Sequence, residues 1–427
     1  MVQTTTSDAF LLGLESLMRR SGQGPHLAAT VLEFDQPLKL ESLHRSASAL
    51  AHRHPLLNAR VRRSPLHFTA EWIPSEAIPM PVAEQAGQSL EEVVQNALAH
   101  AQIDIFKPGP NLEFHLWSNH SNHYLLLIWP HSLFDAIGID KLIGELDSDG
   151  TDPRQDWGET NPTSGYIREI WNTARPMVEE MRTFPSANIR SLHRPKSPPG
   201  APQFEVLRFD KKATQQIHNK LSSTSGELLK IPYFAALSAR STQCVIAKRS
   251  AGPTTLLISL PVQRVPEPSK RPLFHNHMTP WSLILAPELA DDLATATRSL
   301  YRSYASFIRR KLPAAMDALT KLNERCPSRF YLHPIKHFLN GEICSLFHSH
   351  TGELANHTHS LFGRVITDAF HLPTVSTPPG IGIFFSERRG KLTATLSWRE
   401  GSLDQDELNL LRHHLIQDLG ATPSPRP

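Results

Sequence analysis

The chain has 427 residues, with 44 lysines and arginines against 41 acidic residues, so its formal net charge is only +3. This balance excludes the basic footprint of a protein that binds nucleic acid or a membrane surface, and neither is expected as a partner. Hydrophobic residues make up 40% of the chain and charged residues 20%, and the chain is longer than one compact core usually grows, so two lobes are expected.

The cysteines and the N-terminal segment indicate a cytoplasmic protein. The cysteines, Cys244, Cys326 and Cys344, lie far apart and form neither a CxxC pair nor a disulfide framework, which favours a reducing compartment. The N-terminal stretch MVQTTTSDAFLLGLESLMRR has amphipathic leucine spacing and no basic segment before an apolar core, so no signal peptide is predicted. No apolar run approaches the roughly 20 residues that a membrane-spanning helix needs.

Residues 1–150 alternate predicted strands and helices. A strand (LAATVLEFDQP) is followed by a helix (KLESLHRSASALAHRHPLL) whose apolar residues recur in a helical rhythm. Two short strands (NARVRR and LHFTAEWI) precede a helix (SLEEVVQNALAHAQI) that begins with a capping box formed by Ser89 and Glu92. Two further strands (LEFHLWS and HYLLLIW) lead into PHSLFDAIGIDKLIGEL, where a helix is predicted after Asp135. These elements predict an N-terminal lobe.

Residues 151–203 differ from the preceding segment in composition. Polar segments rich in proline and glycine surround one helical piece (YIREIWNTARPMVEEMRTF), which predicts a crossover between two lobes. Residues 204–427 then return to mixed α and β structure, which predicts a C-terminal lobe. The fold class is therefore predicted as α/β, or mixed α+β, with two lobes.

The C-terminal lobe is predicted to contain helices at 211–222 and 231–248, a buried strand (TTLLISLPV) and a long helix (LADDLATATRSLYRSYASFIRRKL). A hairpin (GIGIFFSERRGKLTATLSW) is predicted to turn at Arg389–Gly390. The last helix (LDQDELNLLRHHLIQDL) is predicted to end at Gly420, a suitable C-cap residue.

The spacing His-x-x-x-Asp occurs at three places, His100/Asp104, His131/Asp135 and His414/Asp418. The first pair lies where a helix enters a loop. In the third pair the two side chains share one face of the terminal helix, which is typical of a solvated surface. The pair at 131/135 lies in a different setting, because Pro130 ends an apolar strand and places His131 in the loop beyond it. Asp135 directly precedes a helical run and is also a good N-cap.

Several segments resemble one protein family, in the family's order. PHSLFDA (residues 130–136) resembles the His-His-x-x-x-Asp-Gly signature of the chloramphenicol-acetyltransferase-like superfamily, which includes condensation domains of nonribosomal peptide synthetases and stand-alone acyltransferases. SLHRSASALAHRHPLLNARV resembles the first helix and following turn of condensation domains. LLISLPVQRVPEPSKRPLFHNHMTPW and SLFHSHTGEL resemble two later segments, and the terminal hairpin and helix also match. The resemblance spans nearly the whole chain.

The resemblance implies two similar chloramphenicol-acetyltransferase-like α/β lobes in a V, with an active-site tunnel at their junction. It implies that His131 is the catalytic histidine and that Asp135 shapes the motif loop. It also implies that Arg264, in PVQRV, is the ion-pair partner of Asp135 from the other lobe. A buried pair of this kind is structural, so substitution of Asp135 is expected to harm the fold as much as the rate.

The implied chemistry is acyl transfer from a thioester to a hydroxyl or amine. A neutral imidazole at His131 can take the proton of the attacking nucleophile, and no metal or bound cofactor is required. The oxyanion needs a donor, for which the backbone at Ala136 and the hydroxyls of Ser349 and Thr351 are candidates. The donor substrate is expected to be acyl-CoA or an acyl-phosphopantetheine. The chain contains no carrier domain, so any carrier protein is a separate partner.

Three positions depart from the family's pattern. Pro130 replaces the first histidine, Ala136 the closing glycine, and Gln263 the asparagine of the later segment. An alanine where the backbone needs a positive φ, or a close approach to substrate, costs about 1 kcal/mol or blocks the approach. The alternative function is therefore a catalytically degenerate domain that docks carrier proteins or partner enzymes.

A third hypothesis is a metal-dependent hydrolase. It rests on the pairs His275/His277, His348/His350 and His357/His359, since two histidines at this spacing on a strand point to the same side. No cysteine or acidic cluster completes such a site, so no metal is expected. Dinucleotide-binding, P-loop and serine-nucleophile signatures are absent from the sequence.

Overall fold

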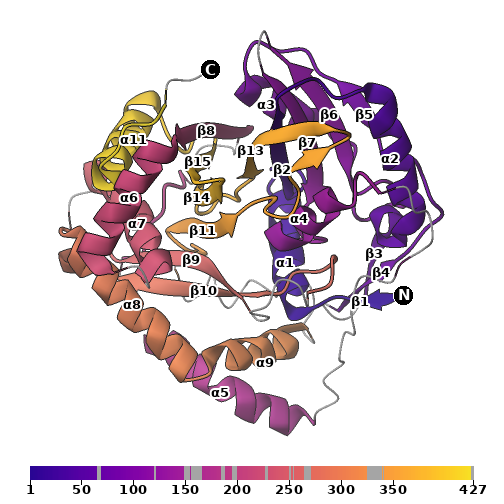
Figure 1. The fold of residues 1–427 in the computed structure, drawn as a ribbon. Coiled ribbons are helices and arrows are strands. Elements are labelled where there is room, and N and C mark those ends of the chain that lie inside the picture. Colours follow the sequence, from indigo (N-terminus) through magenta and orange to yellow (C-terminus); the bar gives the residue numbers. More distant parts are fainter. Residues whose placement is uncertain are drawn as a thin grey trace.

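The computed structural model describes residues 1–64, 69–119, 122–148, 154, 166–183, 188–194, 200–226, 229–249, 252, 254–263, 271–324, 339 and 341–424. Within them the chain forms two α/β lobes that lie side by side (Figure 1). Each lobe is built on a six-stranded sheet. The predicted fold class is confirmed.

The sheet of the first lobe is antiparallel except where β5 and β6 run parallel. Its described strands are, in spatial order, β12 (Ser360–Leu361), β13 (Arg364–Pro373), β2 (Leu27–Phe34), β7 (His123–Pro130), β6 (Glu113–Ser118) and β5 (Val82–Glu84). The sheet's central strands are buried along almost their whole length, which agrees with their continuous apolar sequences.

In the second lobe, β11 runs parallel to both of its neighbours and the other pairs are antiparallel. The described strands are, in spatial order, β10 (Met278–Leu285), β9 (Leu256–Gln263), β11 (Leu346–Glu353), β14 (Ile381–Arg388), β15 (Lys391–Arg399) and β8 (Pro202–Phe209). A small sheet beside the first lobe contains β1 (Val2–Gln3), β4 (Ala70–Ile73) and β3 (Arg60–Arg63).

Helices pack around the two sheets, with α1 and α4 near the junction of the lobes (Figure 1). The described helices are α1 (Thr6–Arg20), α2 (Leu40–Arg53), α3 (Leu90–His100), α4 (Ala136–Gly144), α5 (Ile167–Thr183), α6 (Lys211–Ser225), α7 (Lys230–Arg249), α8 (Leu293–Arg309), α9 (Leu312–Glu324) and α11 (Gln405–Leu419), with short 3-10 turns η1 (Pro55–Asn58) and η4 (Pro287–Leu289). Of these helices, none combines the length and apolar character needed to cross a bilayer.

Several predicted boundaries are confirmed, and others differ. The hairpin turns at Arg389 and Gly390, both with positive φ, and the last helix ends at Gly420 in the left-handed conformation. The helix predicted to continue to residue 57 ends at Arg53 instead, and Pro55 opens the 3-10 turn that follows it. The helix predicted from residue 289 begins at Leu293, because the Asp292 carboxylate caps it.

Strand β13 passes from the second lobe into the sheet of the first lobe. β13 follows β11 in the chain, yet it pairs with β2 over Ile366 to Pro373 and extends the sheet of the first lobe. It also lies against β14 and β15 of the second sheet. The first lobe therefore includes residues from within 204–427, the range that the sequence assigns to the C-terminal lobe.

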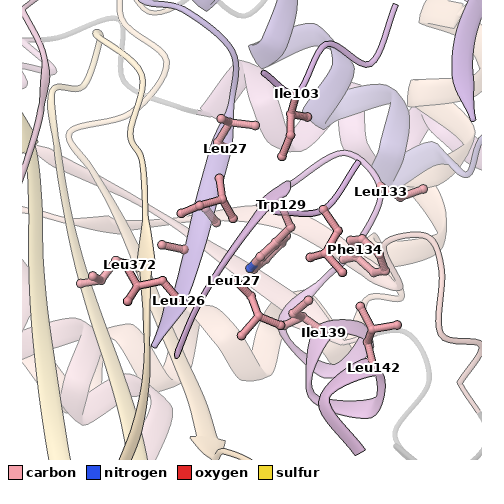
Figure 2. Packing of buried hydrophobic residues seen from close by; sticks show 14 of the residues in the cluster. Leu27, Ile103, Leu126, Leu127, Trp129, Leu133, Phe134, Ile139, Leu142 and Leu372 are labelled. Carbon is pink, nitrogen blue, oxygen red and sulfur yellow. The ribbon is translucent and has the colours of Figure 1, made fainter. Parts of the chain in front are cut away.

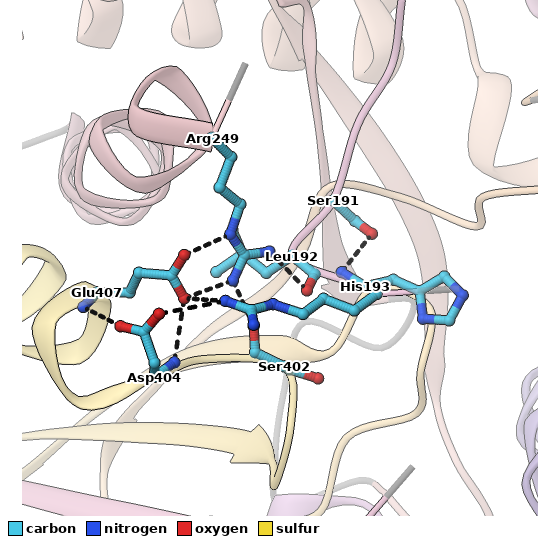
Figure 3. Close-up of polar contacts among 8 residues, drawn as sticks. Ser191, Leu192, His193, Arg249, Ser402, Asp404 and Glu407 are labelled. Carbon is cyan, nitrogen blue, oxygen red and sulfur yellow. Dashed lines mark hydrogen bonds and ion pairs between the residues drawn. The ribbon is translucent and has the colours of Figure 1, made fainter. Parts of the chain in front are cut away.

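The end of the crossover segment is fixed to the second lobe by a network of charges (Figure 3). The guanidinium of Arg249 donates to both carboxylate oxygens of Glu407, at 2.7 Å each, and to the backbone carbonyl of Leu192 at 2.9 Å. Arg194 donates to Glu407 at 2.8 Å and to Asp404 at 3.3 Å. Glu407 thereby joins α7, α11 and the residues that enter β8.

We expect Glu407→Gln to lower the free energy of unfolding at pH 7 by roughly 3 kcal/mol, taking about 1.4 kcal/mol per pKa unit. Burial alone would raise the pKa of Glu407, but the hydrogen bond and charge of Arg249 lower it from 4.5 to about 2. The folded pKa lies below the unfolded one, so the stabilisation is present above pH 4.5 and is lost as the pH falls toward 2. Urea unfolding at pH 7 and near pH 3 measures it.

The matched control is Glu179→Gln, since Glu179 pairs with Arg175 on the exposed side of α5. This exposed pair should contribute less than about 0.5 kcal/mol. Equal losses for the two variants would contradict the account of Glu407.

Candidate active site

A cavity of about 450 Å³ lies between the two lobes. Residues of α1, β2 and β7 line it from the first lobe, and residues of β9, β10, β11 and β14 line it from the second. Residues of α7, α8 and β15 also line it, and so does β13 through His371 and Pro373. His131 and Asp135 both line this cavity, at the end of β7.

The hydrogen bonds of His131 fix its position and its tautomer. Its backbone N–H donates to the carbonyl of His26 at 3.1 Å, which extends the strand pairing by one residue beyond Pro130. Its Nδ1 lies 3.2 Å from the carbonyl oxygen of Phe134. A carbonyl oxygen only accepts, so Nδ1 carries the proton and Nε2 keeps a free lone pair. Burial lowers the pKa of His131 below 6.5, so the ring is neutral at pH 7.

Aromatic rings hold the imidazole of His131 in place. The ring of His26 stacks on it with centroids 5.3 Å apart, and Trp129 meets it edge-on at 5.4 Å. Trp129 itself lies among buried side chains that include Leu127 and Phe134 (Figure 2). The strand end is therefore a rigid support for the imidazole.

The carboxylate of Asp135 is saturated by hydrogen bonds. Its Oδ1 accepts from the backbone N–H groups of Ile137 at 3.1 Å and Gly138 at 2.8 Å, so it caps α4 as predicted. Its Oδ2 accepts from the backbone N–H of His277 at 3.2 Å and lies 3.5 Å from Nη1 of Arg271. Asp135 therefore fixes the loop and does not reach toward the cavity with a free oxygen.

The cation beside Asp135 is Arg271, whose side chain is only 2% exposed. The predicted partner, Arg264, lies outside the described residues. Both arginines belong to the connection between β9 and β10. The sequence places several basic residues in this connection, and its spacing did not mark Arg271 as one that reaches the first lobe.

The segment 271–277 inserts into the first lobe beside the His131 loop. The backbone N–H of His275 donates to the Leu133 carbonyl at 2.9 Å, and the side-chain amide of Asn276 donates to the His131 carbonyl at 3.0 Å. A Cβ atom at Gly138 would lie 2.3 Å from the Leu273 carbonyl oxygen, so this packing requires a glycine.

The close approach therefore falls at Gly138 and not at position 136. Ala136 is the first residue of α4, lines the cavity and is not among the described residues with positive φ. The alanine that replaces the family's glycine thus carries no backbone strain of this kind.

The pair His275/His277 has a structural role that the sequence did not reveal. Nδ1 of His275 lies 2.6 Å from Oδ2 of Asp8, and both side chains are fully buried. Burial alone would raise the pKa of Asp8, but the charge of His275 and hydrogen bonds from Thr5 and Asn276 lower it. Asp8 belongs to α1, so this contact fixes α1 to the inserted segment.

The pair His348/His350 lies on β11 in the opposite wall of the cavity. Burial lowers the pKa of His348 to about 3. Nε2 of His350 lies 3.3 Å from Glu387, which Lys230 also contacts at 2.5 Å. Across the described residues, no group of three or more His, Cys, Asp or Glu side chains could hold a metal ion.

The predicted oxyanion candidates on β11 differ in their contacts. Ser349 and Thr351 both line the cavity. The hydroxyl of Thr351 donates to the Phe385 carbonyl at 3.3 Å, whereas that of Ser349 has no protein partner within the described chain. Of these two hydroxyls, that of Ser349 is thus the one that a ligand can engage.

The other two His–Asp pairs form no site. Nδ1 of His100 lies 2.8 Å from the Asn96 carbonyl, and Asp104 pairs with Arg19 at 3.2 Å. Asp418 pairs with Arg240 at 2.7 Å instead of with His414.

No protein-family model and no curated protein matches the sequence. Solved structures do match the fold. The trichothecene 15-O-acetyltransferase TRI3 from Fusarium sporotrichioides is 14% identical, with a TM-score of 0.71 over 98% of this chain and 94% of that one. The first condensation domain of the calcium-dependent antibiotic synthetase is 14% identical, with a TM-score of 0.69 over 100% of this chain and 98% of that one.

The epimerization domain from the third module of tyrocidine synthetase B is 11% identical, with a TM-score of 0.62 over 98% of this chain and 97% of that one. These structures include an acetyltransferase, a condensation domain and an epimerization domain, so the likeness concerns the fold. The chain therefore has the same two-lobed α/β fold as this acetyltransferase and this condensation domain, as its motifs implied.

Proposed function

We propose that the protein is an acyltransferase that moves an acyl group from a thioester to a hydroxyl or amine, with His131 as the general base. The observation that carries this proposal is the imidazole of His131. Its Nδ1 proton is held by the Phe134 carbonyl, its Nε2 lone pair is free, and it lines a cavity of about 450 Å³ between the lobes. A neutral imidazole with a free lone pair is the form that a general base needs.

The proposed step is direct transfer without an acyl-enzyme. Nε2 of His131 takes the proton of the nucleophile as its oxygen or nitrogen attacks the thioester carbonyl carbon. The tetrahedral intermediate collapses, the carbon–sulfur bond breaks, and the proton passes from His131 to the thiolate. Holding both substrates in one cavity supplies the proximity that the reaction needs. No step uses a metal ion.

The oxyanion is proposed to meet donors other than the backbone N–H groups of Ile137 and Gly138, because Asp135 already accepts from both. Ser349 from β11 has a hydroxyl without a protein partner among the described residues, and the backbone at Ala136 also lines the cavity. Ser349 and the Ala136 backbone therefore remain the candidates.

The donor is proposed to be acyl-CoA or an acyl-phosphopantetheine carried by a separate protein. Two of the similar structures are a condensation domain and an epimerization domain of peptide synthetases, which favours a thioester donor. A third is an O-acetyltransferase, which favours a hydroxyl acceptor. A panel with both kinds of donor distinguishes the two sources.

The alternative is a non-catalytic domain that docks carrier proteins or partner enzymes. Bulky side chains that filled the space beside His131 would favour this non-catalytic alternative. The cavity beside His131 and the absence of positive φ at Ala136 argue for the enzyme. Docking without turnover remains the outcome that the assay below would reveal.

We expect His131→Ala to reduce acyl transfer by about 10²- to 10⁴-fold, which is the usual contribution of a general base. The assay is initial rates of thiol release with a panel of acyl-CoA and acyl-carrier donors and alcohol or amine acceptors. His414→Ala, on the distant helix α11, is the matched control and should retain the wild-type rate. Equal turnover by wild type and His131→Ala would remove the mechanism.

The pH profile of kcat/KM should have an acid limb below pH 6.5. The base must be neutral, and burial lowers the pKa of His131 below 6.5, so activity is retained down to a lower pH than an exposed histidine would allow. An acid limb at or above pH 6.5, in the absence of other rate-limiting steps, would contradict this assignment.

We expect Asp135→Asn to lower the free energy of unfolding by about 3 kcal/mol, because it leaves the buried charge of Arg271 without its carboxylate. Asn can still cap α4, so Asp135→Ala should lose about 1 kcal/mol more. Urea unfolding measures both. A stable Asp135→Asn protein with activity reduced as strongly as in His131→Ala would instead give Asp135 a direct role in the reaction.

A further inference from the structure

Three side chains share the cavity face of the first sheet. Thr30 on β2 lies directly opposite His371 on β13, and Trp129 on β7 pairs with Ala28, two residues from Thr30. Since alternate residues of a strand point to the same face, these side chains lie together. The hydroxyl oxygen of Thr30 is 2.9 Å from Nε1 of Trp129 and 2.9 Å from Nδ1 of His371.

These two contacts determine the tautomer of His371. The indole N–H of Trp129 can only donate, so it uses one lone pair of the Thr30 oxygen. The hydroxyl proton of Thr30 then needs an acceptor, and Nδ1 of His371 is the acceptor present. The opposite tautomer would leave both the Thr30 proton and the Nε2 lone pair without partners among the described residues. Nδ1 therefore accepts, and Nε2 carries the proton.

The Nε2–H of His371 has no partner among the described residues. His371 is 8% exposed, and its Nε2 is a buried nitrogen without a hydrogen bond. Its ring nevertheless lines the same cavity as His131. Burial lowers the pKa of His371 to about 3, so the ring is a neutral donor at pH 7. His131, which has a neutral acceptor at Nε2, and His371, which has a neutral donor at Nε2, thus line the same cavity.

We propose that His371 is a binding subsite for a neutral carbonyl oxygen of the substrate, which accepts a hydrogen bond from Nε2–H. The inference deepens the proposed function and rests on it for the cavity being the substrate site. A carbonyl oxygen suits this place because it accepts without adding a proton that needs a partner of its own. A carboxylate would have to lose its water beside a neutral ring, which is costly.

The tautomer can be tested on the protein alone. Long-range ¹H–¹⁵N correlation spectra of protein labelled with ¹⁵N-histidine should show His371 protonated at Nε2 and unprotonated at Nδ1 at pH 7. Thr30→Val removes the hydroxyl and should allow the Nδ1–H form, whereas Thr30→Ser retains the hydroxyl and should keep the wild-type pattern. A wild-type ring protonated at Nδ1 would overturn the proposal.

The subsite can be tested with two ligands of matched shape. Cyclohexanone has a carbonyl oxygen, and methylenecyclohexane replaces that oxygen with a CH₂ group. We expect His371→Phe to reduce the affinity ratio of cyclohexanone to methylenecyclohexane by about fivefold, the value of one ordinary hydrogen bond. Thr30→Val, which retains the imidazole, should reduce the ratio in the same direction but by less.

An unchanged ratio in both folded variants would overturn the subsite. If His371→Phe fails to fold, the affinity ratio of cyclohexanone to methylenecyclohexane is compared between Thr30→Val and Thr30→Ser, and this comparison decides. Neither ligand is a thioester and neither measurement requires turnover. Failure of this inference is therefore distinguishable from failure of the proposed acyl transfer.

Discussion

The buried carboxylate of Asp135 is the contact on which the arrangement of the site depends. It caps α4 through two backbone N–H groups and meets the backbone of His277 and the guanidinium of Arg271 from the other half of the chain. The side chains of Asp135 and Arg271 are both buried, so water cannot take the place of either one if the other is removed. One side chain thus sets the start of a helix, the shape of the His131 loop and the position of the inserted segment.

The inserted segment explains why the lobes and the site form together. Gly138 permits the close approach of the Leu273 carbonyl, and the buried contact between Asp8 and His275 brings α1 to the same place. Strand β13, which joins the sheet of the first lobe, is a second connection and brings His371 into the cavity wall. The inserted segment and β13 both come from the second half of the chain, and contacts with the first lobe hold them in position beside the cavity.

Local features of the sequence predicted much of this arrangement. Pro130 at the end of an apolar strand placed His131 beyond it, and Asp135 before a helical run predicted the N-cap. The hairpin turn and the Gly420 cap were likewise predicted, because glycine and turn chemistry act over a few residues. The motifs also predicted the fold, because the order of several motifs along the chain constrains the topology more than a single motif does.

The long-range partners could not be predicted in this way. Asp8 and His275 are 267 positions apart, and Thr30 and His371 are 341 apart. With 23 histidines in the chain, spacing alone could not separate a buried structural ring from one that lines a cavity. His275 of the HNH pair shows the consequence, because its spacing from His277 is also that of metal ligands, whereas its ring holds α1 through Asp8.

The most direct test of the proposed mechanism is to measure where the thioester carbonyl of the donor binds relative to His131. A crystal structure with a non-hydrolysable thioether analogue of acyl-pantetheine should place the carbon that replaces the thioester carbonyl within about 6 Å of Nε2 of His131, which leaves room for one nucleophile atom between them. An analogue bound with that carbon at the far wall of the cavity, out of reach of His131, would contradict it.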